Sequence, residues 1–365
     1  MRVLELFGGI GACTKALKRL GLNPTVVDYV EIDKYAVASY NAINGTNFKP
    51  QDICEWDKDI EVDLIMHGSP CQDFSVAGLQ HGGDENSGTR SSLMYESVRI
   101  ISKLMPKYVL WENVKNVLSA KHRHNFDKYL DALSELGYQN FYQVLNAKDY
   151  GVPQNRERVF VVSILGGGEF KFSDKKELKL RLKDLLEDEA DEKYYLNKQW
   201  HLSTEDVKHD VNEIAQIDGI SYQTTRTVTD VNKICRCLST MSGGQTEPKI
   251  LVKEATKKGY QIAEAGDSIN LQYPNSRTRR GRVGKQISQT LTTTEEMKVV
   301  ASDYRIRKLT PLECWRLMGF DDEDCIKAAE VNSNTKLYKQ AGNSIVVNVL
   351  EAIFKNLLGA DANDY

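Results

Sequence analysis

The stretch Leu4-Glu5-Leu6-Phe7-Gly8-Gly9-Ile10-Gly11 opens the chain with an apolar run and a glycine-rich turn. Val3 to Phe7 has the pattern of a buried strand, and residues 12 to 20 have that of a helix. Glycines let the backbone pass close to a ligand, and a helix N-terminus favours polar or anionic groups. The stretch predicts an α/β fold with a ligand site after its first strand. The alternative is a tight turn that binds nothing.

Further strand patterns at Thr25–Val30, Val62–Met66, Tyr108–Trp111 and Val159–Leu165 alternate with helical ones, the clearest at residues 91–105. Alternation of this kind is typical of βαβ units, so we expect a mostly parallel sheet covered by helices on both faces. Glu31 lies 20 residues after Gly11, and Asp52 ends the next strand-like stretch. An acid in this place can bind ribose hydroxyls, although surface acids would give the same pattern.

The composition changes after Gly166-Gly167-Gly168. Residues 169–210 are rich in both charge signs, and residues 215–300 are short segments rich in Thr, Ser, Gly and Gln. This part predicts a smaller, irregular and partly β domain. The helical signal returns near Leu309, with Thr310 as a candidate N-cap and Pro311 at the first helical position.

The overall composition is that of a soluble globular protein. The chain has 365 residues, 48 basic and 51 acidic side chains, a net charge of -3, and 41% apolar residues. It contains no run near the ~20 apolar residues that cross a membrane, and its first residues leave no room for a signal peptide. The seven scattered cysteines indicate reduced thiols, and Cys235-x-Cys237 lacks the second pair of a structural zinc site, so we expect no metal.

A candidate nucleophile stands in Gly68-Ser69-Pro70-Cys71-Gln72-Asp73-Phe74-Ser75, directly after a predicted strand. Ligands of open α/β sheets gather at the carboxyl ends of strands, where a Cys71 thiolate would be well placed to react. A free cysteine can also be a small core residue. In Trp111-Glu112-Asn113-Val114, the carboxyl of Glu112 leaves an apolar strand, so desolvation would raise its pKa towards that of a proton donor. The alternative is a capping carboxylate.

Two more motifs complete the set. In Gln154-Asn155-Arg156-Glu157-Arg158 the arginines are two apart on an extended segment, so both point the same way and could hold a phosphate, a carboxylate or a base carbonyl. They could equally form a surface charge cluster. Gln340-Ala341-Gly342-Asn343-Ser344 precedes an apolar helical run from Ile345 to Leu350, for which Asn343 and Ser344 suit the cap.

Taken together, these motifs resemble, in their order, those of the DNA (cytosine-5)-methyltransferases of prokaryotic or phage type. The resemblance runs from residue 3 to about residue 350, and it departs mildly at Ser69, where many members have a second proline. It implies a Rossmann-like S-adenosylmethionine-dependent methyltransferase core, residues 1–165 plus 305–365, with a smaller, partly β target-recognition domain, residues 166–304, inserted. The elements that carry it are Phe7-x-Gly9-x-Gly11, Pro70-Cys71-Gln72, Glu112-Asn113-Val114, Gln154-x-Arg156-x-Arg158 and Gln340-x-Gly342-Asn343-Ser344.

The resemblance also implies roles for individual residues. The expected catalytic residues are Cys71, Glu112, Arg156 and Arg158. S-adenosylmethionine would be bound by Phe7, Gly9, Gly11, Glu31, Ile32, Asp52, Ile53, Pro70, Leu93, Asn343 and Ser344. DNA would be bound by Gln72, Ser75 and a basic cluster of five residues in nine positions, namely Arg277, Arg279, Arg280, Arg282 and Lys285.

The expected activity is sequence-specific methylation of carbon 5 of a flipped-out cytosine in double-stranded DNA, through a covalent Cys71 adduct. We expect a cytoplasmic monomer of a bacterial or phage-infected cell, and a cognate restriction endonuclease is a further expected partner. Methylation of a structured RNA and a catalytically silent DNA-binding protein on the same scaffold are the alternatives. The glycine turn and Glu31 alone would also fit a nicotinamide-dependent oxidoreductase, which leaves the Cys71 motif and the arginine pair unexplained.

Overall fold

The structure is a computed structural model that describes residues 1–70, 93–194 and 307–359, and short strands between residues 201 and 300. The chain divides into two compact units. The first contains Met1–Leu180, Cys237–Ser242 and Cys314–Tyr365, and the second contains Arg181–Arg236 and Gly243–Glu313. The boundaries expected from the sequence, 165/166 and 304/305, stay a prediction.

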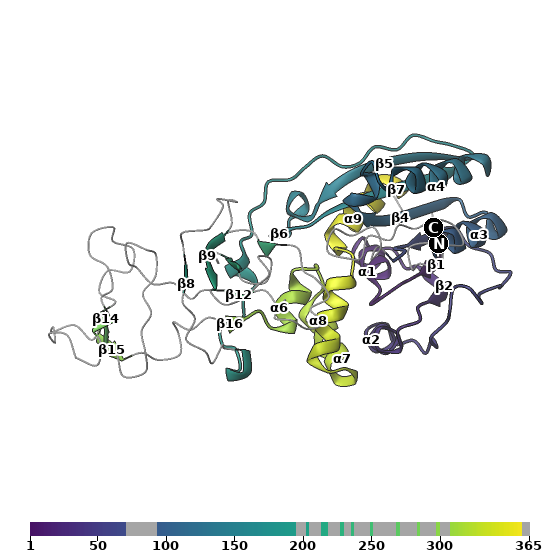
Figure 1. Ribbon diagram of the computed structural model, residues 1–365. Helices are drawn as coiled ribbons and strands as arrows, with labels where there is room; N and C mark the ends of the chain where they lie inside the picture. The colour runs from purple at the N-terminus through teal and green to yellow at the C-terminus, as the bar shows by residue number, and fades with distance from the viewer. Residues whose placement is uncertain are drawn as a thin grey trace. The chain divides into compact units, whose positions relative to one another are not determined.

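The first unit contains a six-stranded sheet in the order β2-β1-β3-β4-β7-β5 (Figure 1). The strands of this unit are β1 (Arg2–Leu6), β2 (Thr25–Val30), β3 (Leu64–His67), β4 (Tyr108–Val114), β5 (Tyr138–Asn146), β6 (Gln154–Asn155) and β7 (Glu157–Leu165). Its helices are α1 (Ala12–Arg19), α2 (Lys34–Asn44), α3 (Met94–Leu104), α4 (Arg123–Glu135), α7 (Asp322–Val331), α8 (Asn334–Asn343) and α9 (Val347–Leu358), with 3-10 turns η2 (Lys115–Leu118) and η3 (Ala147–Tyr150).

Strands β2, β1, β3 and β4 run parallel, so the expected α/β fold with a mainly parallel sheet is confirmed. Strand β7 runs antiparallel to both of its neighbours, β4 and β5. Strand β4 also extends beyond the expected Tyr108–Trp111. Glu112, expected where the strand ends, lies within β4 and pairs with Phe160 of β7, because the antiparallel ladder continues through Val114.

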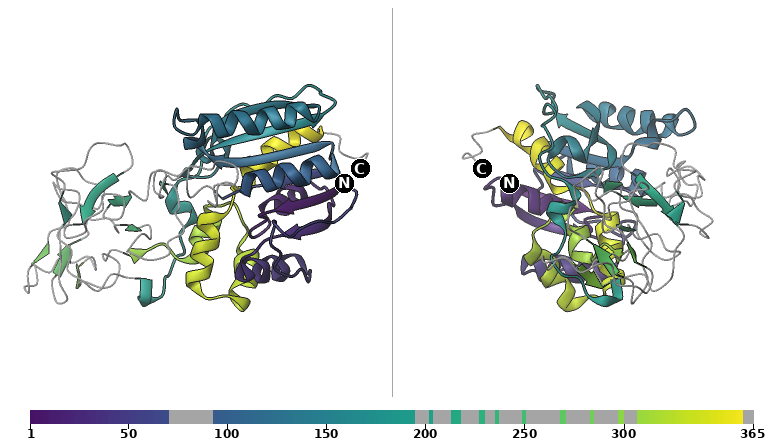
Figure 2. Two further views of the ribbon diagram at one scale, coloured as in Figure 1. Left: turned by 45° about the vertical axis from the view of Figure 1, so that its right-hand side comes forward. Right: turned by 90° about the vertical axis from the view of Figure 1, so that its left-hand side faces the viewer.

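The alternation of side chains along β1 shows which helices cover each face of the sheet. Leu4 and Leu6 belong to the hydrophobic core that α3 and α4 close, together with Ile101 and Phe126 from those helices. Glu5 points to the other face, where it meets side chains of α1 and α2. Helices α3 and α4 also contact each other, and α9 contacts α1. Figure 2 draws the helices and the sheet from two further sides.

The C-terminal helices pack against the N-terminal ones. In Figure 1 the yellow α7 and α9 lie near the purple α2 and α1, which they contact. Asn332 Nδ2 donates to the carbonyl of Tyr35 at 2.9 Å, and the Lys336 ammonium lies 3.9 Å from the centre of the Tyr35 ring. Helix α2 is therefore held against a segment that lies about 300 residues later in the sequence.

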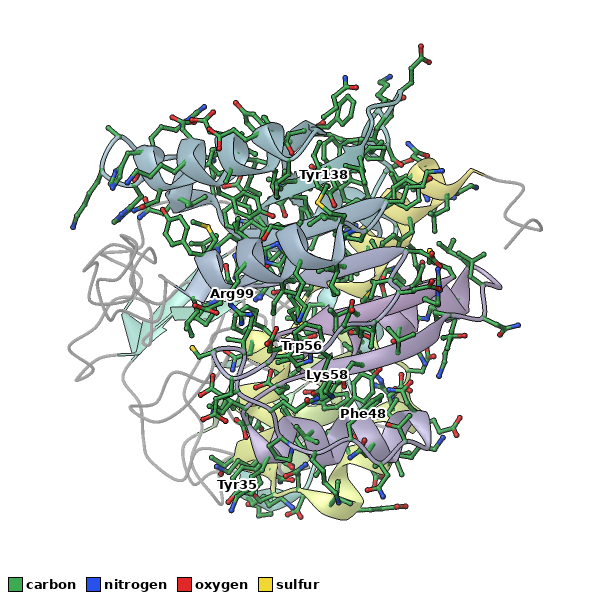
Figure 3. All side chains as sticks on the ribbon, turned by 90° about the vertical axis from the view of Figure 1, so that its right-hand side faces the viewer. Tyr35, Phe48, Trp56, Lys58, Arg99 and Tyr138 are labelled. Carbon is green, nitrogen blue, oxygen red and sulfur yellow. The ribbon has the colours of Figure 1, made fainter. Side chains whose placement is uncertain are left out.

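The loop that leads from α2 towards β3 is held to the sheet and to α3 by buried and partly buried polar contacts. Asp28 of β2 accepts hydrogen bonds from Trp56 Nε1 at 2.8 Å and from Lys58 Nζ at 2.6 Å, and Figure 3 shows the two donors close together. Arg99 of α3 donates to the carbonyls of Ile53 and Trp56, each at 3.0 Å. These contacts fix the segment that carries Asp52 and Ile53.

The second unit contains small sheets, as expected for a partly β domain. A five-stranded sheet has the order β16-β12-β10-β9-β8, and a three-stranded sheet the order β14-β13-β15. Thr310 and Glu313 form a capping box at the start of α6 (Pro311–Arg316), which confirms the expected N-cap. The other elements are η4 (Leu182–Leu185), η5 (Glu192–Tyr194), β8 (Leu202–Ser203), β9 (Glu213–Ile217), β10 (Thr227–Thr229), β11 (Cys235–Arg236), β12 (Lys249–Ile250), β13 (Ser268–Asn270), β14 (Val283–Gly284), β15 (Met297–Val299) and β16 (Arg307–Lys308).

Candidate active site

A cavity opens at the carboxyl ends of β1, β3 and β4. Strand β1 has β2 on one side and β3 on the other, so this is the point where the strand order reverses. Ligands of open α/β sheets bind at such a switch point. The lining residues are Glu5, Leu6, Phe7, Gly8, Gly9, Ile10, Ala12, Cys13, Met66, Gly68, Glu112, Asn343, Ser344 and Ile345.

The glycine turn between β1 and α1 forms one wall of the cavity. A side chain on Gly8 would lie 2.5 Å from the Tyr29 ring, and one on Gly11 would lie 2.8 Å from the Tyr40 ring, so both glycines allow close packing. Gly9 has a φ of +54°, and a Cβ there would meet no protein atom within 4 Å. The turn is thus packed tightly on its inner side and leaves space beside Gly9.

Glu5 is a buried acid that lines this cavity, with 2% of its surface exposed. Its carboxylate accepts hydrogen bonds from Thr14 Oγ1 and from the Tyr40 hydroxyl, the latter at 3.2 Å. Burial raises the pKa of Glu5 to about 7, although these hydrogen bonds and Lys18 oppose the shift. The cavity therefore holds a carboxyl group that would gain from a nearby positive charge.

Glu31 and Ile32 follow β2 and lie outside the lining of the cavity. The Glu31 carboxylate accepts hydrogen bonds from the amides of Gly9 at 3.2 Å and Asp33 at 2.8 Å, so it fastens the glycine turn to the end of β2. Burial raises its pKa. The Ile32 side chain is 68% exposed, which is unusual for a residue of its kind next to a sheet. It offers an apolar surface beside the turn.

The other expected cofactor residues are placed differently. Asp52 Oδ1 accepts a hydrogen bond from the Cys54 amide at 2.9 Å, and Ile53 is 4% exposed in the core. Gly11, Pro70 and Leu93 are also absent from the lining, Leu93 being packed against the same core. Of the eleven residues expected to bind the cofactor, the cavity brings together Phe7, Gly9, Asn343 and Ser344.

Glu112 reaches the cavity from β4 and pairs with Arg158 of β7, whose Nε lies 3.1 Å from its Oε1. Burial raises the pKa of Glu112, while Arg158 and Arg156 oppose the shift. Its other oxygen, Oε2, lies near Gly68, three residues before Cys71 in the sequence. The structure therefore joins the motif of Glu112 and the motif of Arg158 in one ion pair at the cavity.

The backbone that leads to Cys71 is held by β4. Trp111 Nε1 donates to Ser69 Oγ at 3.0 Å, and Asn113 Nδ2 donates to the Ser69 carbonyl at 3.3 Å. Ser69 is buried. Cys71 itself lies outside the described residues, as do Gln72, Ser75, Arg277, Arg279, Arg280, Arg282 and Lys285.

Asn343 and Ser344 do not cap the following helix, so the alternative interpretation of this motif as a helix cap is wrong. Asn343 is the last residue of α8, Ser344 is its C-cap, and α9 begins only at Val347. The break between the two helices turns Asn343 and Ser344 towards the cavity, which they line. The pattern of Asn and Ser before an apolar run fits a cap, but it fits a helix break as well.

Sequence reasoning assigned no role to nine of the residues that line the cavity, among them Glu5, Cys13, Gly68 and Ile345. An acid inside an apolar strand was the available signal for Glu5, since a carboxylate is rarely buried without a partner. Within the described ranges, no cluster of His, Cys, Asp and Glu side chains has the geometry of a metal site. No helix among those residues is long and apolar enough to cross a membrane.

Comparison with known proteins identifies one family along almost the whole chain. The model of the C-5 cytosine-specific DNA methylases matches residues 1–359. The orphan methyltransferase M.SPBetaI of Bacillus phage SPbeta is 31% identical, and the match covers 100% of this chain and 98% of that protein. The type II methyltransferase M2.ScrFI of Lactococcus lactis subsp. cremoris is 38% identical over 81% of this chain and 67% of its own length.

Solved structures agree on the fold. The Dnmt2 methyltransferase of S. pombe has a TM-score of 0.61 and 18% identity, with 100% of both chains covered. A putative DNA modification methyltransferase from an E. coli prophage has a TM-score of 0.60 and 20% identity, with 98% of both chains covered. Because the family model matches almost every residue and a 31% identical relative matches over the full length, this chain belongs to the C-5 cytosine-specific DNA methylases and is a DNA (cytosine-5)-methyltransferase.

Proposed function

We propose that this enzyme transfers a methyl group from S-adenosylmethionine to carbon 5 of a cytosine that is flipped out of a specific DNA sequence. One observation carries the proposal. A single cavity at the switch point of the sheet is lined by the glycine turn, by Asn343 and Ser344, and by Glu112, which is paired with Arg158. A cofactor on the turn and a base beside Glu112 would therefore meet.

The residues at the cavity fit S-adenosylmethionine. The open space at Gly9 leaves room for a ligand against the backbone, and the buried carboxyl of Glu5 suits a cationic group. The exposed Ile32 would pack on the adenine ring, and Glu31 would bind the ribose hydroxyls. Asp52 would accept from the adenine amino group. When bound, the cofactor supplies an electrophilic methyl group on a sulfonium.

The protein's own residues prepare the cytosine to accept that methyl group. The Cys71 thiolate adds to carbon 6 and forms a sulfur–carbon bond, which turns the ring into an enamine that is nucleophilic at carbon 5. Glu112 holds a proton at the ring nitrogen, and Arg158 binds the base carbonyl and steadies Glu112. After methylation, carbon 5 loses its proton, the bond to Cys71 breaks, and the aromatic ring is restored.

Recognition of DNA falls to the segment 166–304, which we propose as the target-recognition domain. Its basic cluster from Arg277 to Lys285 would bind phosphates, which give affinity, while contacts to base edges give specificity. Gln72 and Ser75, next to the nucleophile, would contact the target strand. The base must leave the helix because carbon 5 and carbon 6 cannot be attacked within the stacked duplex.

The test is methyl transfer from labelled S-adenosylmethionine to mixed-sequence DNA and to transfer RNA side by side, followed by bisulfite sequencing. We expect label in DNA at one recurring sequence and none in RNA. Cys71→Ala should abolish transfer and retain the fold. Label in RNA alone would establish methylation of a structured RNA. If neither substrate is labelled, the remaining alternative is a catalytically silent DNA-binding protein.

The cellular setting needs a separate experiment. Among the relatives, one is named an orphan enzyme and another a type II enzyme. We propose a cytoplasmic monomer in a bacterial or phage-infected cell. If it has a cognate endonuclease, plasmid DNA methylated by this enzyme should resist cleavage by extracts of the source cell, whereas unmethylated plasmid should be cut at the same sequence.

A further inference from the structure

Two side chains of the Gln154-x-Arg156 segment donate hydrogen bonds to the C-terminal part of the chain. Arg156 Nη2 lies 2.8 Å from the carbonyl oxygen of Ser344 and 3.1 Å from that of Gly342. Gln154 Nε2 lies 2.6 Å from the carbonyl oxygen of Leu317. Gln154 is fully buried and Arg156 is 4% exposed, so these contacts form in the interior, where lost hydrogen bonds are expensive.

The two carbonyls that Arg156 binds flank Asn343. Asn343, Ser344 and Ile345 all line the cavity, and we call residues 342–345 the C-terminal wall. Gln154 supports the same wall indirectly. It holds the turn at Leu317, and the next residue, Met318, accepts a hydrogen bond from the amide of Val347 at 3.0 Å, where α9 begins.

The backbone that carries Gln154 and Arg156 is itself held by hydrogen bonds. The Arg156 amide donates to Asn146 Oδ1 at 3.1 Å, and its carbonyl accepts from the Ala147 amide at 3.1 Å. Strand β7, which follows directly, is paired on both sides. The C-terminal wall lies between α8 and α9 and is not adjacent in sequence to a strand of the sheet. The side chains of Gln154 and Arg156 connect it to the sheet.

We propose that Gln154 and Arg156 are positioning residues for the cofactor: they hold the C-terminal wall in place and thereby set the affinity for S-adenosylmethionine. Arg158 makes an ion pair with Glu112. The motif is thus divided between two tasks, with Arg158 acting on the target base and the two preceding polar residues acting on the cofactor side. This inference rests on the proposed function, because it assumes S-adenosylmethionine in the cavity.

The experiment measures the dissociation constant of S-adenosylmethionine by calorimetry and the kinetic constants on DNA. Arg156→Lys keeps the charge but loses the planar donor group that spans two carbonyls. We expect its dissociation constant and its KM for the cofactor to rise about tenfold, equivalent to about 1.4 kcal/mol, and this loss of cofactor affinity to exceed the loss in kcat at saturating cofactor. Gln154→Met, which loses the hydrogen bond to the Leu317 carbonyl, should raise the dissociation constant about threefold. Arg123→Lys, on the surface of α4, is the control.

The outcomes separate the possibilities. If the wild type binds no S-adenosylmethionine, the proposed function fails. If it binds and both variants bind as tightly, or if Arg156→Lys loses more than tenfold in kcat at saturating cofactor, the positioning role is overturned. A role in general stability alone would lower the unfolding midpoint without cofactor and leave the ratio of KM values for cofactor and DNA unchanged.

Discussion

The indole Nε1 of Trp111 lies 3.0 Å from the hydroxyl oxygen of Ser69, and through this bond β4 holds the segment that leads to Cys71. Ser69 stands two residues before Cys71, a distance of at most ~7 Å between Cα atoms. It also occupies the position where many members of the family have proline. In this chain the serine gives a buried indole its acceptor.

The bond between Ser69 and Trp111 should be visible in a double-mutant cycle. Ser69→Ala leaves the indole N–H buried without its acceptor, which should cost about 1–3 kcal/mol in the free energy of unfolding. Trp111→Phe removes the donor together with part of the ring. The double variant should be less destabilised than the sum of the single variants, because it leaves no unpaired N–H. Urea unfolding measures all three, and strictly additive losses would contradict the role of this bond.

The buried acid Glu5 should make stability depend on pH. Its pKa is about 7 in the folded protein against 4.5 for the exposed group. Between these values the unfolded chain loses the proton while the folded protein keeps it, so stability falls as pH rises and the fall ends above pH 7. The difference of about 2.5 units corresponds to roughly 3 kcal/mol.

Glu5→Gln isolates this contribution, because the amide oxygen still accepts from Thr14 and Tyr40. Measured by urea unfolding at pH 5 and pH 8, the variant should lose less stability than the wild type over this interval, by roughly 2–3 kcal/mol. Equal losses in the two proteins would show that Glu5 ionises normally in the folded state. Glu323→Gln, at an exposed position of α7, is the control.

Gly9 and Gly11 should respond differently to alanine. At Gly11 the new Cβ would lie 2.8 Å from the Tyr40 ring at a φ of +85°, so Gly11→Ala should destabilise the fold by roughly 3 kcal/mol. At Gly9 the space is open and only the backbone strain remains, about 1 kcal/mol. Phe7 adopts a φ of +52° in the same turn, which shows that a side chain is tolerated there.

The space beside Gly9 belongs to the cavity, so Gly9→Ala should weaken S-adenosylmethionine binding by tenfold or more although it unfolds almost like the wild type. Thermal unfolding and calorimetric titration of both variants check this contrast. Normal cofactor affinity in Gly9→Ala would mean that the cofactor does not approach this backbone.

The sequence predicts the elements whose apolar residues are continuous. The expected bounds of the second strand, Thr25–Val30, are those of β2, and the glycine turn follows β1 as expected. Strand β5 was not predicted, because its Gln and Asn residues interrupt any apolar run and several of its side chains are exposed. The antiparallel direction of β7 was also not predicted, since strand direction depends on the connection through β5 and β6 and not on the strand's own residues.

The candidate site shows the same division. Motifs of fixed spacing located the glycine turn, Glu112, and Asn343 and Ser344 of the C-terminal wall. Contacts between distant segments could not be read from the sequence, because they depend on which faces the sheet brings together. The bond from Arg156 to Ser344 spans 188 positions, and the burial of Glu5 becomes evident only once α1 and α2 cover its face of the sheet.

The ion pair of Glu112 and Arg158 should determine how activity depends on pH. Burial raises the pKa of Glu112 and Arg158 is the largest opposing influence, so the charge-free variant Arg158→Gln should raise that pKa further. If the proton on Glu112 assists the base, kcat/KM falls as pH rises through this pKa. In Arg158→Gln the falling limb of the pH profile of kcat/KM should therefore lie at higher pH. The maximum of that profile should be at least tenfold lower than in the wild type, because Arg158 is proposed to bind the target base. Arg158→Lys, which keeps the charge, should retain the wild-type limb. A limb that stays in place in both variants would assign it to a group other than Glu112.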